Sequence, residues 1–112
     1  MRYKRYIPQN ASELLDQLAY MMLDSPTFED RTGYFPEENI DTTFYSLNHG
    51  LMGIRKTLGE ERYAAFTTMS DKMRTLFESD AENKTGDAKA GRALIHEMEN
   101  ILMEVARREE EQ

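Results

Sequence analysis

The chain has 112 residues, of which 39% are hydrophobic and 31% charged, and its formal net charge is -7. These values are typical of one globular domain (residues 1–112) with a hydrophobic core, and they exclude a disordered chain, which could not offset its ordering entropy. The absence of cysteine excludes disulfides and thiolate chemistry, and the acidic balance argues against nucleic acid as a partner.

The start of the chain does not resemble an export signal. Arg2, Lys4 and Arg5 are basic, but Pro8-Gln9-Asn10 follows where a secretory signal has its apolar segment. The longest apolar run, residues 18–23, is far shorter than the roughly 20 residues that cross a bilayer. We therefore expect a cytoplasmic protein that does not bind membranes.

The first predicted helix covers residues 11–24. Asn10 and Glu13 have the spacing of a capping box at its start. The helix is expected to end before Ser25-Pro26, because the residue before a proline avoids the α conformation. Its apolar residues recur at steps of three and four and define one face: Leu14, Leu15, Leu18, Met21 and Met22.

Residues 25–39 show no helical period and contain two prolines and a glycine. Such a long loop in a small domain is usually functional or disordered. Three aromatic residues, Phe28, Tyr34 and Phe35, favour an ordered loop.

Three further helices are predicted after the loop, at residues 41–58, 60–79 and 88–108. The first has a heptad-like seam that includes Phe44, Leu51 and Leu58, and Gly59 is suited to close it. The polar stretch 80–87 is expected to be a turn. Connections that are mostly short imply an all-α fold, an antiparallel four-helix bundle with a long loop between its first two helices.

The two histidines bear on metal chemistry. The metalloprotease motif requires a second histidine four residues after the first, but Asn100 follows His96 at that distance. Di-iron bundles require Glu-x-x-His, and Ala93 and Ser46 stand where the glutamates would be. The sequence therefore predicts no metal site and no cofactor.

The surroundings of His49 nevertheless match a known pattern. The residues His49, Leu51, Gly53, Leu58 and Gly59 resemble the histidine-containing phosphotransfer domains, which are four-helix bundles. The resemblance implies an exposed, phosphorylatable His49, with Gly53 giving a response regulator access to it. The family's lysine three residues after the histidine is replaced by Met52. The alternative is a histidine beside the seam, with Gly50 and Gly53 present for close helix packing, since each glycine costs a helix about 1 kcal/mol.

The predicted loop region concentrates negative charge. Residues 24–41 contain six acidic side chains and one arginine, a net charge of -5. Aromatic anchors surrounded by like charges are typical of an interface that attracts a basic partner. The candidate binding residues are Phe28, Asp30, Tyr34, Phe35, Glu37 and Glu38. The alternative is that Phe28 and Phe35 only attach the loop to the bundle.

These observations favour a small, acidic, non-enzymatic protein-binding module, with no catalytic residues. An adaptor, an inhibitor or an immunity-type protein that neutralises a basic toxin fits this description by analogy. The expected partner is a basic or neutral protein. The alternative function is phosphotransfer through His49, and a homodimer through the exposed edge of the 41–58 helix is compatible with both.

Overall fold

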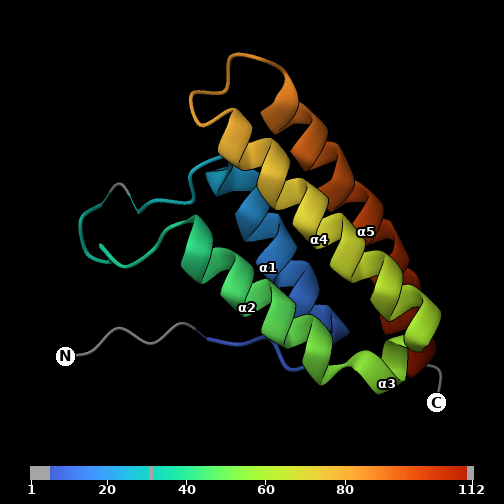
Figure 1. The fold of residues 1–112 in the computed structure, drawn as a ribbon. Coiled ribbons are helices and arrows are strands. Elements are labelled where there is room, and N and C mark those ends of the chain that lie inside the picture. Colours follow the sequence, from blue (N-terminus) through green and yellow to red (C-terminus); the bar gives the residue numbers. More distant parts are fainter. Residues whose placement is uncertain (1–5, 31, 111–112) are drawn as a thin grey trace.

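The computed structural model describes residues 6–30 and 32–110. These residues form no strand and five helices: α1 (Ala11–Asp24), α2 (Ile40–Gly53), α3 (Arg55–Leu58), α4 (Glu60–Ser79) and α5 (Asp87–Glu110) (Figure 1). The all-α prediction is confirmed, but there are five helices where four were expected. The basic residues Arg2, Lys4 and Arg5 lie outside the described ranges.

Helix α1 begins at the predicted cap. The side chain of Asn10 accepts a hydrogen bond from the Glu13 backbone N–H at 2.9 Å. The Glu13 carboxylate reaches one residue further than in a standard capping box, and it accepts bonds from the Gln9 backbone N–H at 2.8 Å and the Tyr6 hydroxyl at 2.6 Å. The segment before α1 is thereby attached to the first turn of the helix.

The predicted 41–58 helix is interrupted at Ile54, and the expectation of one continuous helix was wrong. Ile54 has φ -106° and ψ 18°, and its N–H donates to the carbonyls of Gly50 and Leu51 at 3.3 Å each. Glycine contributes little to helix stability, and Gly50 and Gly53 lie immediately before the break. The apolar seam continues across it, because Leu51, Ile54 and Leu58 are all buried.

The turn between α4 and α5 is organised by Asp80, whose side chain is buried. Its carboxylate accepts hydrogen bonds from the backbone N–H groups of Lys84 at 2.6 Å, Thr85 at 3.0 Å and Ala88 at 3.0 Å. These bonds, that from Ala88 most of all, lower the pKa of Asp80 to about 2. The carboxylate is therefore ionised at neutral pH and stabilises the start of α5.

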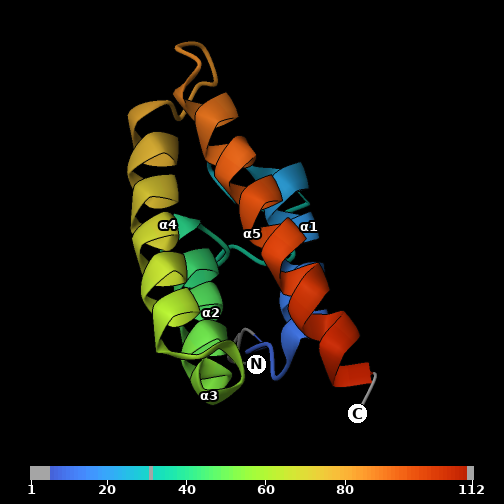
Figure 2. The ribbon, with the colours of Figure 1, turned by 90° about the vertical axis from the view of Figure 1, so that its right-hand side faces the viewer.

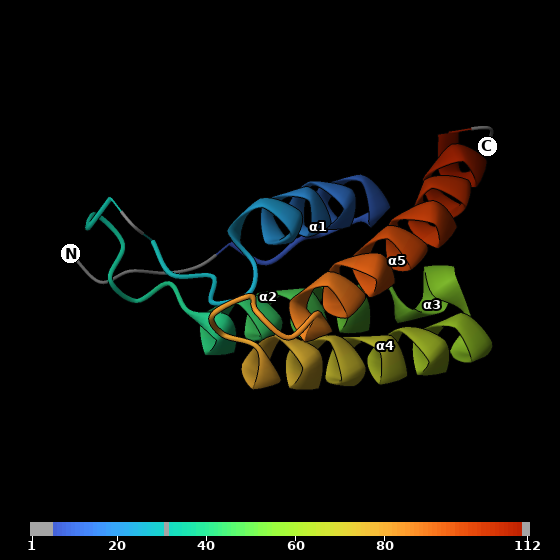
Figure 3. The same cartoon turned by 90° about the horizontal axis from the view of Figure 1, so that it is seen from above.

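The four long helices pack side by side, and each packs mainly against two of the others. Helix α1 lies against α2 and α5, and α4 lies against the same two helices. Figures 2 and 3 show α1 and α5 on one side of the molecule and α2 and α4 on the other. The short helix α3 continues from α2 and contacts α4.

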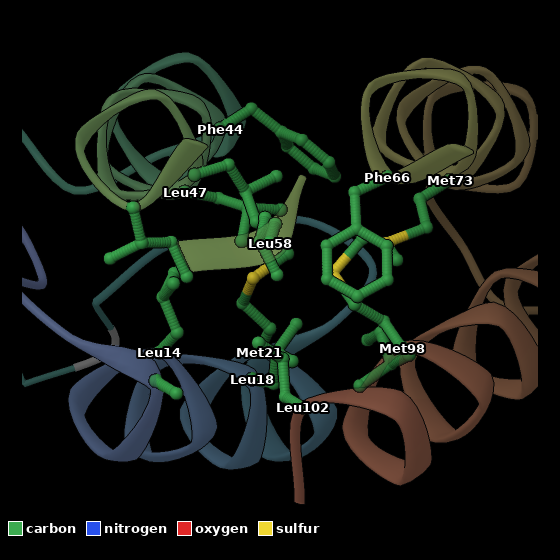
Figure 4. Packing of buried hydrophobic residues seen from close by; sticks show 14 of the residues in the cluster. Leu14, Leu18, Met21, Phe44, Leu47, Leu58, Phe66, Met73, Met98 and Leu102 are labelled. Carbon is green, nitrogen blue, oxygen red and sulfur yellow. The ribbon is translucent and has the colours of Figure 1, made fainter. Parts of the chain in front are cut away.

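The core lies between these helices and is built from aliphatic, methionine and phenylalanine side chains. Figure 4 shows side chains of α1 (Leu14, Leu18 and Met21) and of the neighbouring α5 (Met98 and Leu102) meeting those of α2, α3 and α4 (Phe44, Leu47, Leu58, Phe66 and Met73). No helix within the described ranges combines the length and apolar character required to span a bilayer.

Candidate functional site: the loop between α1 and α2

Phe28 fixes the first half of the loop to the core. Its ring is fully buried and packs edge-on against Phe44 and Phe77, at centroid distances of 5.9 and 5.3 Å. Its φ of 60° lies in the left-handed region, which is unfavourable for a bulky residue and is offset here by aromatic burial. The expectation that Phe28 contacts a partner therefore requires correction, because the core already covers the whole ring.

Asp30 organises the tip of the loop. Its carboxylate accepts hydrogen bonds from the Thr32 hydroxyl at 2.7 and 2.8 Å, the Thr32 N–H at 3.2 Å and the Phe35 N–H at 2.8 Å. The Thr32 hydroxyl, followed by the Phe35 N–H, lowers the pKa of Asp30. This predicted binding residue therefore has an internal role, as it holds the backbone on both sides of Tyr34.

The most exposed aromatic side chain of the loop is Tyr34, with 82% of its surface accessible, and Phe35 is 49% exposed. Leu23, near the end of α1, is 84% exposed. Leu23 and Thr32 both line a hollow of about 270 Å³, together with Asp24, Glu29 and Asp30. The loop thus carries two exposed aromatic residues beside an acidic hollow with one apolar wall.

Leu23 was missed as a candidate, although the sequence carries a signal for it. The buried positions Leu14, Leu18 and Met21 define the stripe of α1. Leu23 is a large apolar residue on the side of α1 opposite this stripe, where a helical projection places it towards solvent.

Several acidic residues of the 24–41 segment are engaged inside the protein. The Tyr20 hydroxyl donates to the Glu38 carboxylate at 3.2 Å, and Asp41 forms an ion pair with Arg74 of α4. Glu29 and Glu37 are exposed and make no ion pair with another described residue. Of the predicted acidic binding residues, Glu37 is the one whose carboxylate remains directed at solvent.

His49 lies on α2, away from this loop. The side chain is exposed, and its ring lies 4.0 Å from the ring of Tyr45, between centroids, with an interplanar angle of 32°. Met52, at the position where the phosphotransfer family has lysine, is 55% exposed. The nearby basic residue Arg55 already has partners: it donates hydrogen bonds to the Glu60 carboxylate at 2.7 and 2.8 Å, and its guanidinium lies over the ring of Tyr63.

The two glycines beside His49 have different surroundings. A Cβ on Gly50 would lie 3.0 Å from Leu14 Cδ2 and 3.2 Å from Pro8 Cβ, so Gly50 permits close packing. A Cβ on Gly53 would meet no atom within 4 Å. The packing explanation therefore accounts for Gly50 and leaves Gly53 with open space one turn from His49.

Within the described ranges, no three His, Asp or Glu side chains are grouped so that they could hold a metal ion. His96 is exposed, and its nearest acidic neighbour is Glu99, at 3.1 Å between Nδ1 and Oε1. Comparison of the chain with protein-family models, with curated proteins and with solved structures finds no match.

Proposed function

We propose that this protein is a non-enzymatic binding module of the adaptor, inhibitor or immunity type, whose partner is a basic or neutral protein. In this proposal α1, α2, α4 and α5 act as an antiparallel four-helix bundle, and the long loop between α1 and α2 meets the partner. The observation that carries the proposal is the exposure of Tyr34 on a loop whose backbone is held in place.

The backbone that carries Tyr34 is held in place before any partner binds, which favours Tyr34 as a binding residue. Phe28 attaches the loop to the core, and Asp30 holds the backbone from Thr32 to Phe35. A side chain on a fixed backbone loses little further conformational entropy on binding. Tyrosine is also enriched among interface residues that contribute about 2 kcal/mol or more.

The remaining charge supports a basic partner. The carboxylates of Glu29 and Glu37 lie on the exposed side of the loop. Exposed charges at the edge of an interface act mainly on the association rate, through long-range attraction. A basic partner would therefore be drawn towards the face that carries Tyr34.

The first experiment isolates the partner from an extract of the native host and measures its binding kinetics by surface plasmon resonance. Tyr34→Ala should raise the dissociation rate roughly 30-fold, as expected for the loss of about 2 kcal/mol. Tyr45→Ala is the matched control, because Tyr45 is also an exposed tyrosine, at 56%, but lies on α2. If Tyr45→Ala has the larger effect, the interface lies on α2 and the proposal is wrong.

The second experiment reverses the exposed charges. Glu29→Lys combined with Glu37→Lys should slow association and reduce its dependence on salt, because both carboxylates face solvent. Asp30 and Glu38 are unsuitable for this test, since both make hydrogen bonds within the protein. An association rate that stays unchanged would show that the partner does not approach this face.

Phosphotransfer through His49 is the second candidate. The exposed ring and the open space at Gly53 are the two features that the resemblance implies. Incubation with phosphorylated response regulators should then give an acid-labile, base-stable adduct that is lost in His49→Gln. An adduct that persists in His49→Gln would exclude this residue as the acceptor.

A further inference from the structure

Helix α3 and the last turns of α5 lie together at the end of the molecule away from the α4–α5 turn (Figure 1), and a second hollow lies beside them. Its volume is about 350 Å³, and it is lined by Thr57, Arg62, Val105, Arg108 and Glu109. These residues come from α3, from the first turn of α4 and from the last turns of α5. The hollow therefore brings two arginines together in a protein whose net charge is -7.

Neither arginine is neutralised by a close carboxylate. Arg62 donates one hydrogen bond to the Leu58 carbonyl, at 3.4 Å, and forms no ion pair with a described residue. Arg108 lies 3.8 Å from Glu104, whose carboxylate is bound more closely by Arg107, at 2.7 Å. By contrast, Arg55 is paired with Glu60 at 2.7 Å. The guanidinium donors of Arg62 and Arg108 are thus largely available to a ligand.

Other features of the hollow also suit a small anionic ligand. Helix α4 begins at Glu60, and its N-cap Gly59 makes no side-chain hydrogen bond. The positive end of the helix dipole therefore lies close to Arg62, in a first turn that also carries Glu60 and Glu61. Thr57 adds a hydroxyl group, and Val105, which is only 4% exposed, lies at the base of the hollow. The carboxylate of Glu109 repels an anion, so replacing it with a neutral side chain should strengthen binding.

We propose that this hollow binds the phosphate group of a small phosphorylated molecule. The two guanidinium groups, partly offset by Glu109, leave the hollow with a net positive charge, and planar guanidinium donors are suited to paired hydrogen bonds with phosphate oxygens. The volume of the hollow lies at the small end of the range for ligand sites, which leaves room for a compact group attached to the phosphate. This site is separate from the loop that carries Tyr34, and it does not depend on the function proposed for that loop.

The test is an NMR titration of the full chain, labelled with ¹⁵N, with phenyl phosphate as the probe. Saturable shifts are expected at the Nε–H signals of Arg62 and Arg108. Arg62→Gln and Arg108→Gln should each raise Kd roughly fivefold, as expected for a partly exposed charge pair, and Glu109→Gln should lower it roughly twofold. Arg55→Gln is the matched control and should leave Kd unchanged, because that arginine is already paired with Glu60.

Two further probes separate the contributions to binding. Inorganic phosphate should shift the same arginine signals, whereas benzoate, which keeps the ring but carries one charge, should bind several-fold more weakly. The proposal is overturned if no shift saturates, if benzoate binds as tightly as phenyl phosphate, or if Arg55→Gln weakens binding as much as Arg62→Gln. Circular dichroism of each variant identifies any change that arises from unfolding.

Discussion

Two glycines provide a matched test of the packing that supports the loop. Gly91 of α5 is buried, and a Cβ built there would lie 2.7 Å from Cε1 and 2.8 Å from Cζ of Phe77. The ring of Phe77 is fully buried and packs against Phe28. It therefore cannot move without displacing the residue that attaches the loop. A Cβ at Gly53, at the end of α2, would meet no atom within 4 Å.

The expected effects of alanine at these two positions have opposite signs. Replacing a helical glycine by alanine favours the helix by up to about 1 kcal/mol. At Gly91 this gain is opposed by an overpacking cost of about 1–3 kcal/mol, and the confinement of Phe77 places the cost near the upper end. Gly91→Ala should therefore lower the free energy of unfolding by about 2 kcal/mol, whereas Gly53→Ala should raise it by about 0.5–1 kcal/mol.

Urea denaturation followed by circular dichroism measures both changes. Adding Phe77→Leu to Gly91→Ala should cost less than the sum of the two single substitutions, because the smaller side chain leaves room for the new methyl group. Equal stability of Gly91→Ala and Gly53→Ala would refute the inference that α5 approaches Phe77 closely through Gly91.

Three further predictions concern the buried side chains of Thr43, Phe28 and Asp80. Thr43→Val should raise the free energy of unfolding by about 1 kcal/mol in urea denaturation, because the buried Thr43 hydroxyl has no partner among the described residues. Phe28→Ala should lower it by about 3–5 kcal/mol, as for other buried phenylalanines. In the folded protein the pKa of Asp80 is about 2, below its ordinary value of 3.8. Asp80 therefore stabilises the fold at pH values above 3.8, and this stabilisation is lost as the pH falls towards 2. Asp80→Asn should therefore flatten the acid limb of a plot of melting temperature against pH.

The helices were largely predictable, because their apolar residues recur with the helical period. The 41–58 helix was predicted as continuous since the buried seam formed by Leu51, Ile54 and Leu58 is the same with or without a break. The start of α2 was placed one residue late. Its capping box pairs Asn39 with Thr42, and the usual signature has glutamate or glutamine at that position.

The loop was less predictable, because its residues follow no period that separates buried from exposed side chains. Composition alone placed Phe28, Tyr34 and Phe35 in one class, yet Phe28 is buried in the core and Tyr34 lies in solvent. Likewise, Asp30 and Glu37 are both acidic, but Asp30 is bonded to the loop backbone. Tertiary contacts decide these roles, and a single sequence does not encode them in a local pattern.

Hydrogen exchange at single amides, in the free protein and in its complex with the isolated partner, tests the proposed loop interface most directly. The Phe35 amide, which donates to Asp30 at 2.8 Å, should already exchange slowly in the free protein, as expected for a preorganised loop. In the complex, new protection should appear at the amides of residues 32–38 other than Pro36, which has no N–H. Protection confined to α2 around Tyr45 and Met52, with residues 32–38 unchanged, would contradict the proposal that the loop binds the partner.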